Sequence, residues 1–176
     1  IREAIRMLEQ EGLAVTIPRK GAEVAKMTLK DMEDVLEVRE ALDELAAQIA
    51  CTKMNEQQMA ELIRIKDEFE KNTDSSDVKL IAETDEKFHD IIYESTDNAK
   101  LVVLLNNLRE QIYRYRVEYL KNKDNYPALI QEHEEIVEAL KAHDKDKVTE
   151  AMHKHVMNQA MAVKEVIQMQ DQQNQE

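Results

Sequence analysis

The spacing of apolar and polar positions predicts that this chain is helical over most of its length. From residue 28 onward, apolar residues recur three and four positions apart, as they do on one face of an α-helix. Helix-breaking residues are rare, because the chain has 2 Gly and 2 Pro, and both glycines, Gly12 and Gly21, lie near its start. The predicted helices are 29–52, 56–71, 77–95, 98–123, 127–142 and 145–170. Helices of this length joined by short loops predict an all-α antiparallel bundle.

Polar residues at the ends of these segments support the predicted boundaries. Thr28 with Asp31, and Asn55 with Gln58, have the spacing of a capping box at a helix start. The other start signals are Asp97 or Asn98, Pro127 and Asp144. The cluster 72–77 is rich in Asn, Asp and Ser and is therefore predicted to be a loop.

The N-terminal segment follows a different pattern. Residues 1–11 are interpreted as the end of an amphipathic helix that stops at Gly12. Two β-prone runs, 13–17 and 22–25, flank a basic turn, which predicts a short hairpin. A helix followed by such a hairpin is typical of a winged helix-turn-helix, which binds DNA, although an ordinary helix–hairpin unit is the alternative. The chain starts without Met and inside a helical pattern, so we expect a fragment whose N-terminus is missing.

Three parts are therefore expected. They are the C-terminal part of a winged-helix DNA-binding domain (1–27), an all-helical domain (28–170), and a frayed tail (171–176). The net charge of −13 argues against nucleic-acid binding by the whole surface. Residues 1–30 nevertheless hold six Lys/Arg against four Asp/Glu, a net of +2, so the remainder carries −15. A basic head on an acidic body indicates two different roles.

Cysteine content and hydropathy indicate the compartment. The single cysteine, Cys51, excludes an internal disulfide and fits a reducing environment. No apolar run approaches the ~20 residues that a membrane-spanning helix needs, and no signal peptide is recognisable. A cytoplasmic protein without a membrane partner is expected.

Helical-wheel positions indicate which titratable side chains face the interior. In the third helix of the body, Asp85 lies in the middle of the apolar face and His89 flanks that face. In the fifth and sixth helices, His133 and His155 lie at the centre of the apolar stripes, whereas His153 points to the opposite side. Three histidines and one carboxylate are therefore predicted to point inward from three helices.

A buried carboxylate without a partner costs several kcal/mol. A divalent cation would remove this cost, because neutral imidazoles and a carboxylate are suitable ligands for Zn²⁺ or Ni²⁺. The predicted ligands are Asp85, His89, His133 and His155. The alternative is a buried Asp–His pair together with two core histidines.

Two arginines are candidates for binding an anion beside this metal. Arg39 lies within the apolar face of the first body helix, and Arg116 flanks the apolar face of the fourth. Arginine binds carboxylates in a bidentate fork, so both are candidates for the counter-charge of an anionic ligand. For Arg39 the alternative is a buried salt bridge to a neighbouring Glu, and Arg114 is expected to point away.

Several stretches of the chain resemble one known family. The stretch "IREAIRMLEQEGLAVTIPRKGAEVA" resembles the recognition helix and wing of GntR-family bacterial transcription regulators. The stretches "VLEVREALDELAAQIA", "DEKFHDIIYESTDNAKL" and "EHEEIVEALKAHDKDKVTEAMHKHV" resemble the FCD ligand-binding domain of the FadR subfamily. The resemblance covers essentially the whole chain, except that the first two helices of the winged domain are absent. The usual Gly of the link before the last helix is His143 here, which makes this side chain a possible stray ligand.

The resemblance implies specific roles for residues of this chain. One Asp and three His bind a divalent metal in metal-binding members, and they map onto the same four residues that the helical wheel selects. Small organic acids bind at that metal with the help of an Arg that maps onto Arg39. The implied DNA contacts are Arg2, Arg6, Arg19, Lys20 and Gly21.

The sequence thus predicts a ligand-responsive DNA-binding regulator, a homodimer that binds operator DNA and a small carboxylate effector. No recognisable nucleophile motif or phosphate-binding loop is present, so an enzyme is not expected. The alternative is an all-α metallohydrolase of the His-Asp phosphohydrolase type, suggested by the doublets His89-Asp90 and His143-Asp144. A ferritin-like di-metal bundle would need more inward-facing carboxylates than the one predicted here.

Overall fold

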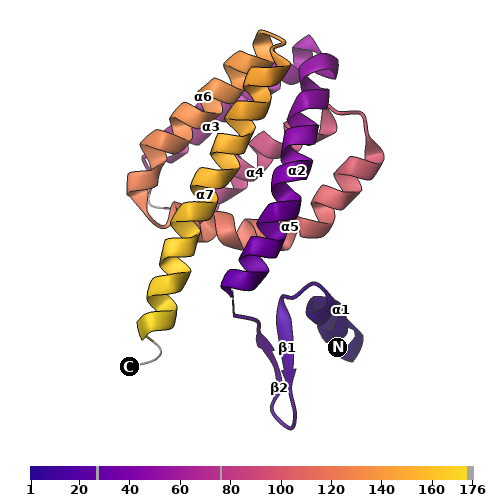
Figure 1. Cartoon of the computed structure of the whole chain (residues 1–176), viewed down its shortest axis with the longest axis vertical. Coiled ribbons are helices and arrows are strands. Elements are labelled where there is room, and N and C mark those ends of the chain that lie inside the picture. The colour runs from indigo at the N-terminus through magenta and orange to yellow at the C-terminus, as the bar shows by residue number, and fades with distance from the viewer. Residues whose placement is uncertain (27, 76, 174–176) are drawn as a thin grey trace.

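The structure is a computed structural model that describes residues 1–26, 28–75 and 77–173. Over these residues the chain forms a helical bundle with a small helix–hairpin segment below it (Figure 1). The elements are α1 (Arg2–Gln10), β1 (Ala14–Ile17), β2 (Gly21–Val24), α2 (Leu29–Lys53), α3 (Glu56–Asn72), α4 (Val78–Glu94), α5 (Ala99–Leu120), the 3-10 helix η1 (Lys123–Asn125), α6 (Tyr126–Lys141) and α7 (Lys145–Gln173). Within the described residues, no helix is long and apolar enough to cross a bilayer.

The helix starts follow the predicted capping chemistry. The Asn55 side chain accepts a hydrogen bond from the Gln58 amide at 2.9 Å, and the Gln58 side chain accepts one from the Asn55 amide at 3.0 Å. Thr28, Asn98 and Asp144 also accept hydrogen bonds from backbone amides of the helices that follow them. These bonds satisfy amide groups that the first helical turn leaves without intrahelical partners.

The C-terminal ends of two helices differ from the prediction. The helix predicted for 98–123 ends at Leu120 and is followed by η1, where Asn125 donates a side-chain bond to the Tyr119 carbonyl. The last helix continues through residues 171–173, which were expected to fray, and 174–176 lie outside the described residues.

The core lies between the helices of the body. Helices α2 and α7 run alongside each other, α6 packs on α7, and α4 lies between α3 and α5 (Figure 1). The buried apolar side chains lie on the inner faces of the helices, for example Leu62, Phe88, Ile92, Ile136 and Met152, all fully buried. Burial of such stripes is the main source of helix stability in a bundle.

The N-terminal segment contacts the body through few polar bonds. β1 and β2 pair antiparallel from Ala14 opposite Val24 to Ile17 opposite Gly21, as the hairpin prediction requires. Of residues 1–26, only Ala25 is buried, and its carbonyl accepts a bond from Arg114 of α5 at 2.7 Å. Arg114 therefore points away from the interior, as expected, and connects the hairpin to the bundle.

Candidate metal centre

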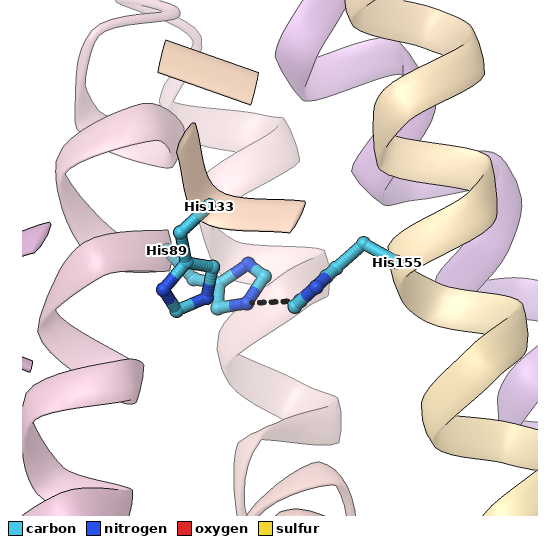
Figure 2. Close-up of side chains that lie close together, drawn as sticks. All are labelled: His89, His133 and His155. Atoms are coloured by element: carbon cyan, nitrogen blue, oxygen red, sulfur yellow. Dashed lines mark hydrogen bonds between the residues drawn. The ribbon is translucent and has the colours of Figure 1, made fainter. Parts of the chain in front are cut away.

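Three buried histidines from three helices meet inside the bundle (Figure 2). His89 projects from α4, His133 from α6 and His155 from α7, and each side chain is 0–1% exposed. One ring nitrogen of each lies within 4.8 Å of the corresponding nitrogens of the other two. Nε2 of His89 and Nε2 of His155 are 3.1 Å apart. The helix stripes place the three imidazoles together, as the wheel positions predicted.

Aromatic packing fixes the ring of His133. It stacks on Phe88 with ring centroids 4.1 Å apart, and the ring of Phe69 approaches it edge-on at 4.8 Å. Phe88 precedes His89 on α4, so one helix contributes both a candidate ligand and the surface that orients another. A ring held in this way has little freedom to turn away from the cluster.

Asp85 lies one turn before His89 and is fully buried. Its Oδ1 is 3.1 Å from Nε2 of His133, and its Oδ2 contacts Nε of Arg116. At this centre the mutually close set of ligand atoms consists of the three histidines, and Asp85 flanks this set beside His133. The structure therefore brings the four predicted ligands into one region, with the carboxylate turned toward an arginine.

Burial controls the protonation of these groups. Burial lowers the pKa of His89 well below its usual value, and the nearby charge of Arg116 adds to this effect. Burial also lowers the pKa of His133, although Asp85 acts in the opposite direction. Burial would raise the pKa of Asp85, but the charge of Arg116 and the contact with His133 outweigh it and hold the pKa well below its usual value. Neutral imidazoles beside an ionised carboxylate are the forms that bind a metal.

Several polar atoms at the centre lack a hydrogen-bond partner among the described residues. They are Nδ1 of His89, both ring nitrogens of His133 and both carboxylate oxygens of Asp85. Oδ1 of Asp85 faces the His133 ring and Oδ2 faces the Arg116 guanidinium, but neither contact has hydrogen-bond geometry. Unsatisfied buried polar atoms are rare in native proteins and costly. A divalent cation would bind one nitrogen of each ring and a carboxylate oxygen, so the donor set fits one metal ion.

Glu132 orients the third histidine. Its Oε2 is 3.0 Å from Nδ1 of His155, which leaves Nε2 of that ring facing the cluster. Its Oε1 accepts a 2.6 Å bond from Asn158. A carboxylate behind a ligating histidine is a common second partner in metal sites. Sequence reasoning did not identify Glu132, although its position directly before His133 was a usable signal.

Arg39 occupies a buried network next to the histidines. Its Nε donates to Asp43 at 2.9 Å and its NH1 donates to Gln159 at 3.1 Å, while NH2 has no partner in the described structure. Nε2 of Gln159 is in turn 3.2 Å from Nε2 of His155, and the Tyr93 hydroxyl donates to Asp43 at 2.5 Å. The buried salt bridge that was the alternative for Arg39 is thus present, but its partner is Asp43, one turn along α2, and not a Glu. Sequence reasoning missed Asp43, Tyr93 and Gln159, although each of them lies four residues after a predicted site residue.

The two remaining histidines lie outside the cluster. Nδ1 of His143 is 2.7 Å from the carbonyl oxygen of Cys51, and its backbone has a φ of +51°, a conformation that glycine adopts more easily. His153 is exposed, and its Nδ1 is 2.9 Å from carboxylate oxygens of both Glu40 and Glu44. His143 is therefore held at a helix end, and His153 belongs to a separate surface group.

The doublets that suggested a metallohydrolase have different partners. His89 belongs to the cluster, but Asp90 pairs with Arg109 at 2.8 Å. Asp144 caps α7, and His143 contacts a backbone carbonyl. Of the four residues in the two doublets, only His89 thus reaches the candidate centre, so the structure does not favour a metallohydrolase.

The predicted DNA contacts all lie on the N-terminal segment. Arg2 and Arg6 are exposed on α1, one turn apart. Arg19, Lys20 and Gly21 are exposed at the hairpin tip, where Arg19 has a φ of +68° and Gly21 a φ of +102°. The basic residues are thus presented on a helix and on a loop that protrude from the bundle (Figure 1).

The fold and the centre define an all-helical domain with a buried candidate metal site, attached to a helix–hairpin segment. The sequence model of the FCD domain matches residues 34–158, and the chain therefore belongs to the FCD domain family. The predicted resemblance to GntR/FadR-like regulators with this domain is confirmed, as is the all-α bundle.

Relatives cover nearly the whole chain. The chain is 25% identical over 170 residues to the HTH-type transcriptional regulator YdhC of Bacillus subtilis, covering 96% of this chain and 75% of that protein. It is 23% identical over 168 residues to the HTH-type transcriptional repressor RspR of Escherichia coli, covering 96% and 74%. The solved structure of E. coli McbR/YncC superposes with a TM-score of 0.84 at 18% identity, covering 93% of this chain and 82% of that one. This last similarity supports the fold.

Proposed function

We propose that this chain is a ligand-responsive transcription regulator whose helical domain senses a small organic acid at a bound metal ion. The observation that carries the proposal is the donor set, three buried histidines within 4.8 Å beside a buried, ionised carboxylate. Buried ring nitrogens of His89 and His133 have no hydrogen-bond partner in the described structure, which is costly unless a cation binds the cluster. The regulator relatives support the DNA-binding part of the proposal.

His89, His133 and His155 would hold the metal through ring nitrogens, and Asp85 would complete the set. Zn²⁺ or Ni²⁺ suits these ligands, and a metal with an open position would supply a Lewis acid for a carboxylate oxygen. Oδ1 of Asp85 already lies beside His133, whereas Oδ2 contacts Arg116, and in this proposal the carboxylate turns from the arginine to the ion when the metal binds. Glu132 fixes the ring of His155 for this role.

A small carboxylate would be the effector. Arg39 has one guanidinium nitrogen without a partner, next to the chain of bonds that leads through Gln159 to His155. Arg116, once released by Asp85, would offer a second buried guanidinium. Two arginines and an open metal position would distinguish a carboxylate from its neutral amide.

The N-terminal segment would contact operator DNA through Arg2, Arg6, Arg19, Lys20 and Gly21. A homodimer would present two such segments to a palindromic operator in the bacterial cytoplasm. An effector that binds one arrangement of the heads better than another would then change DNA affinity.

Elemental analysis and native mass spectrometry of the purified protein test the metal and the dimer together. We expect one Zn or Ni per chain in a dimer, and loss of the metal in His155→Ala. The exposed His153→Ala variant is the matched control and should keep the metal. An unmetallated wild type after loading with Zn²⁺ or Ni²⁺ would refute the metal site. Operator binding that does not change across a panel of carboxylates would refute the sensing role.

A further inference from the structure

A pocket between α4 and α5 extends to the candidate metal centre. Its inner end is lined by His89 and Arg116, which are 1% and 3% exposed. Its outer end is lined by Glu86, Asp90 and Arg109, whose side chains are 22%, 30% and 35% exposed. The gradient in exposure marks a route from the surface to the buried ligands.

The route is closed to anything larger than water. The pocket measures about 20 Å³ for a water-sized sphere, which is room for about one water molecule. An organic acid does not fit this volume, and a metal ion would have to pass the charged side chains at the outer end. Side chains at this end must therefore move before a ligand enters.

Arg109 ties the two helices together across the outer end. Its NH2 is 2.8 Å from Oδ1 of Asp90, its NH1 is 3.1 Å from Oδ2, and NH1 also contacts Glu86. Asn106 of the same helix braces the guanidinium at 2.7 Å. The two bonds to Asp90 form the bidentate geometry that makes arginine–carboxylate pairs specific. Because the side chains are partly exposed, the guanidinium can swing into solvent without a change in either helix.

We propose that this ion bridge, Arg109 with Glu86 and Asp90, is the closure of the entrance to the metal centre. The proposal rests on the proposed metal site and adds a gating role for residues that neither bind the metal nor touch the effector. Opening the bridge exposes two carboxylates to an incoming divalent cation and one guanidinium to an incoming organic acid. The bridge therefore sets how fast ligands exchange, and the buried groups set how tightly they bind.

Zinc exchange in the full chain tests this role. Release of Zn²⁺ from the loaded protein to excess chelator, and its uptake by the metal-free protein, are followed for wild type, R109A and E86Q/D90N. Both rates should rise roughly three- to thirtyfold in both variants, as expected for the loss of two partly exposed ion pairs, with the Zn²⁺ Kd unchanged. The two variants change the charge at the entrance in opposite directions. Rates that follow charge, faster uptake in R109A and slower uptake in E86Q/D90N, would overturn the closure.

The control is R64A. Arg64 also pairs with two carboxylates, those of Glu61 and Glu68, but on the outer surface of α3. Its loss should leave zinc exchange at the wild-type rate. Acceleration equal to that of R109A would mean that general loosening, not the entrance, controls exchange.

A readout without metal separates this inference from the proposed function. Carbethoxylation of His89 in the metal-free protein, measured by peptide mass spectrometry, should be faster in both bridge variants. The exposed His153 should react equally in all of them. If the wild type binds no metal, the proposed function fails, but the labelling still tests whether the ion bridge closes the entrance. Equal rates at His89 in wild type and both variants would refute the closure.

Discussion

The buried pair of Asp85 and Arg116 leads to a large and specific prediction for stability. The two side chains are 0% and 3% exposed and in direct contact. Removing one partner of a buried ion pair leaves a charge without compensation and typically costs about 3–5 kcal/mol. D85N keeps the shape of the side chain and removes its charge, so we expect it to lower the free energy of unfolding by about that amount. For a chain of this length this corresponds to a fall in Tm of roughly 6–20 °C.

Urea unfolding in EDTA, followed by circular dichroism, measures this loss. R116M should also destabilise, because it leaves the Asp85 carboxylate buried without its cation. The double variant D85N/R116M should lose clearly less than the sum of the single losses, with a coupling of at least about 2 kcal/mol. The exposed pair Arg64–Glu61 is the control and should couple by no more than about 1 kcal/mol.

The same double-mutant cycle, repeated at saturating Zn²⁺, tests whether Asp85 leaves Arg116 to bind the metal. If the carboxylate moves to the metal, its coupling to Arg116 should fall. A coupling below about 1 kcal/mol in EDTA would refute the buried ion pair. Full coupling that persists with bound Zn²⁺ would show that Asp85 does not leave Arg116 for the metal.

Three other predictions concern the residues around the centre. E132Q should weaken metal binding about 10- to 100-fold in competition titrations, because the Glu132 carboxylate orients His155. F88A should lower the free energy of unfolding by about 3–5 kcal/mol in urea, since the fully buried ring also packs on His133. The folded-state pKa values of His89 and His133 are lowered, so their contribution to stability is complete above about pH 6.5 and falls as the pH drops below it. Metal-free protein should lose up to about 1.4 kcal/mol per pH unit for each of them, and stability that does not change between pH 7.5 and 5.5 would contradict this.

Sequence patterns were sufficient where the structure depends on local chemistry. Asn55 with Gln58 forms the predicted capping box, because both bonds join groups three residues apart. The inward positions of His133 and His155 followed from the helical period, because a residue centred in an apolar stripe has to face the core. Periodicity also excluded His153, which is exposed in the structure.

Contacts between distant helices could not be predicted in the same way. Arg39 and Gln159 are 120 residues apart in the chain, and their bond depends on how α2 crosses α7. Arg116 has a long side chain with several rotamers, so its wheel position did not indicate that it reaches Asp85. The ion bridge between Arg109 of α5 and the carboxylates of Glu86 and Asp90 on α4 could not be predicted for the same reason, because it depends on how these two helices pack.

The balance of buried charge would connect the proposed metal to the proposed acidic effector. Among the described residues, the buried acidic and basic side chains other than histidine are Arg39, Asp43, Asp85, Arg116 and Glu132, which together carry a formal charge of −1. Metal ligation requires neutral imidazoles, so a divalent ion would change this interior charge to +1. An unbalanced positive charge in a low-dielectric interior is unfavourable, and one carboxylate would neutralise it. The arginine released by Asp85 would lie beside the metal, where the carboxylate would bind. Metal binding would therefore create both the need for an anion and the site for it, and the proposed sensor would respond to organic acids for this reason.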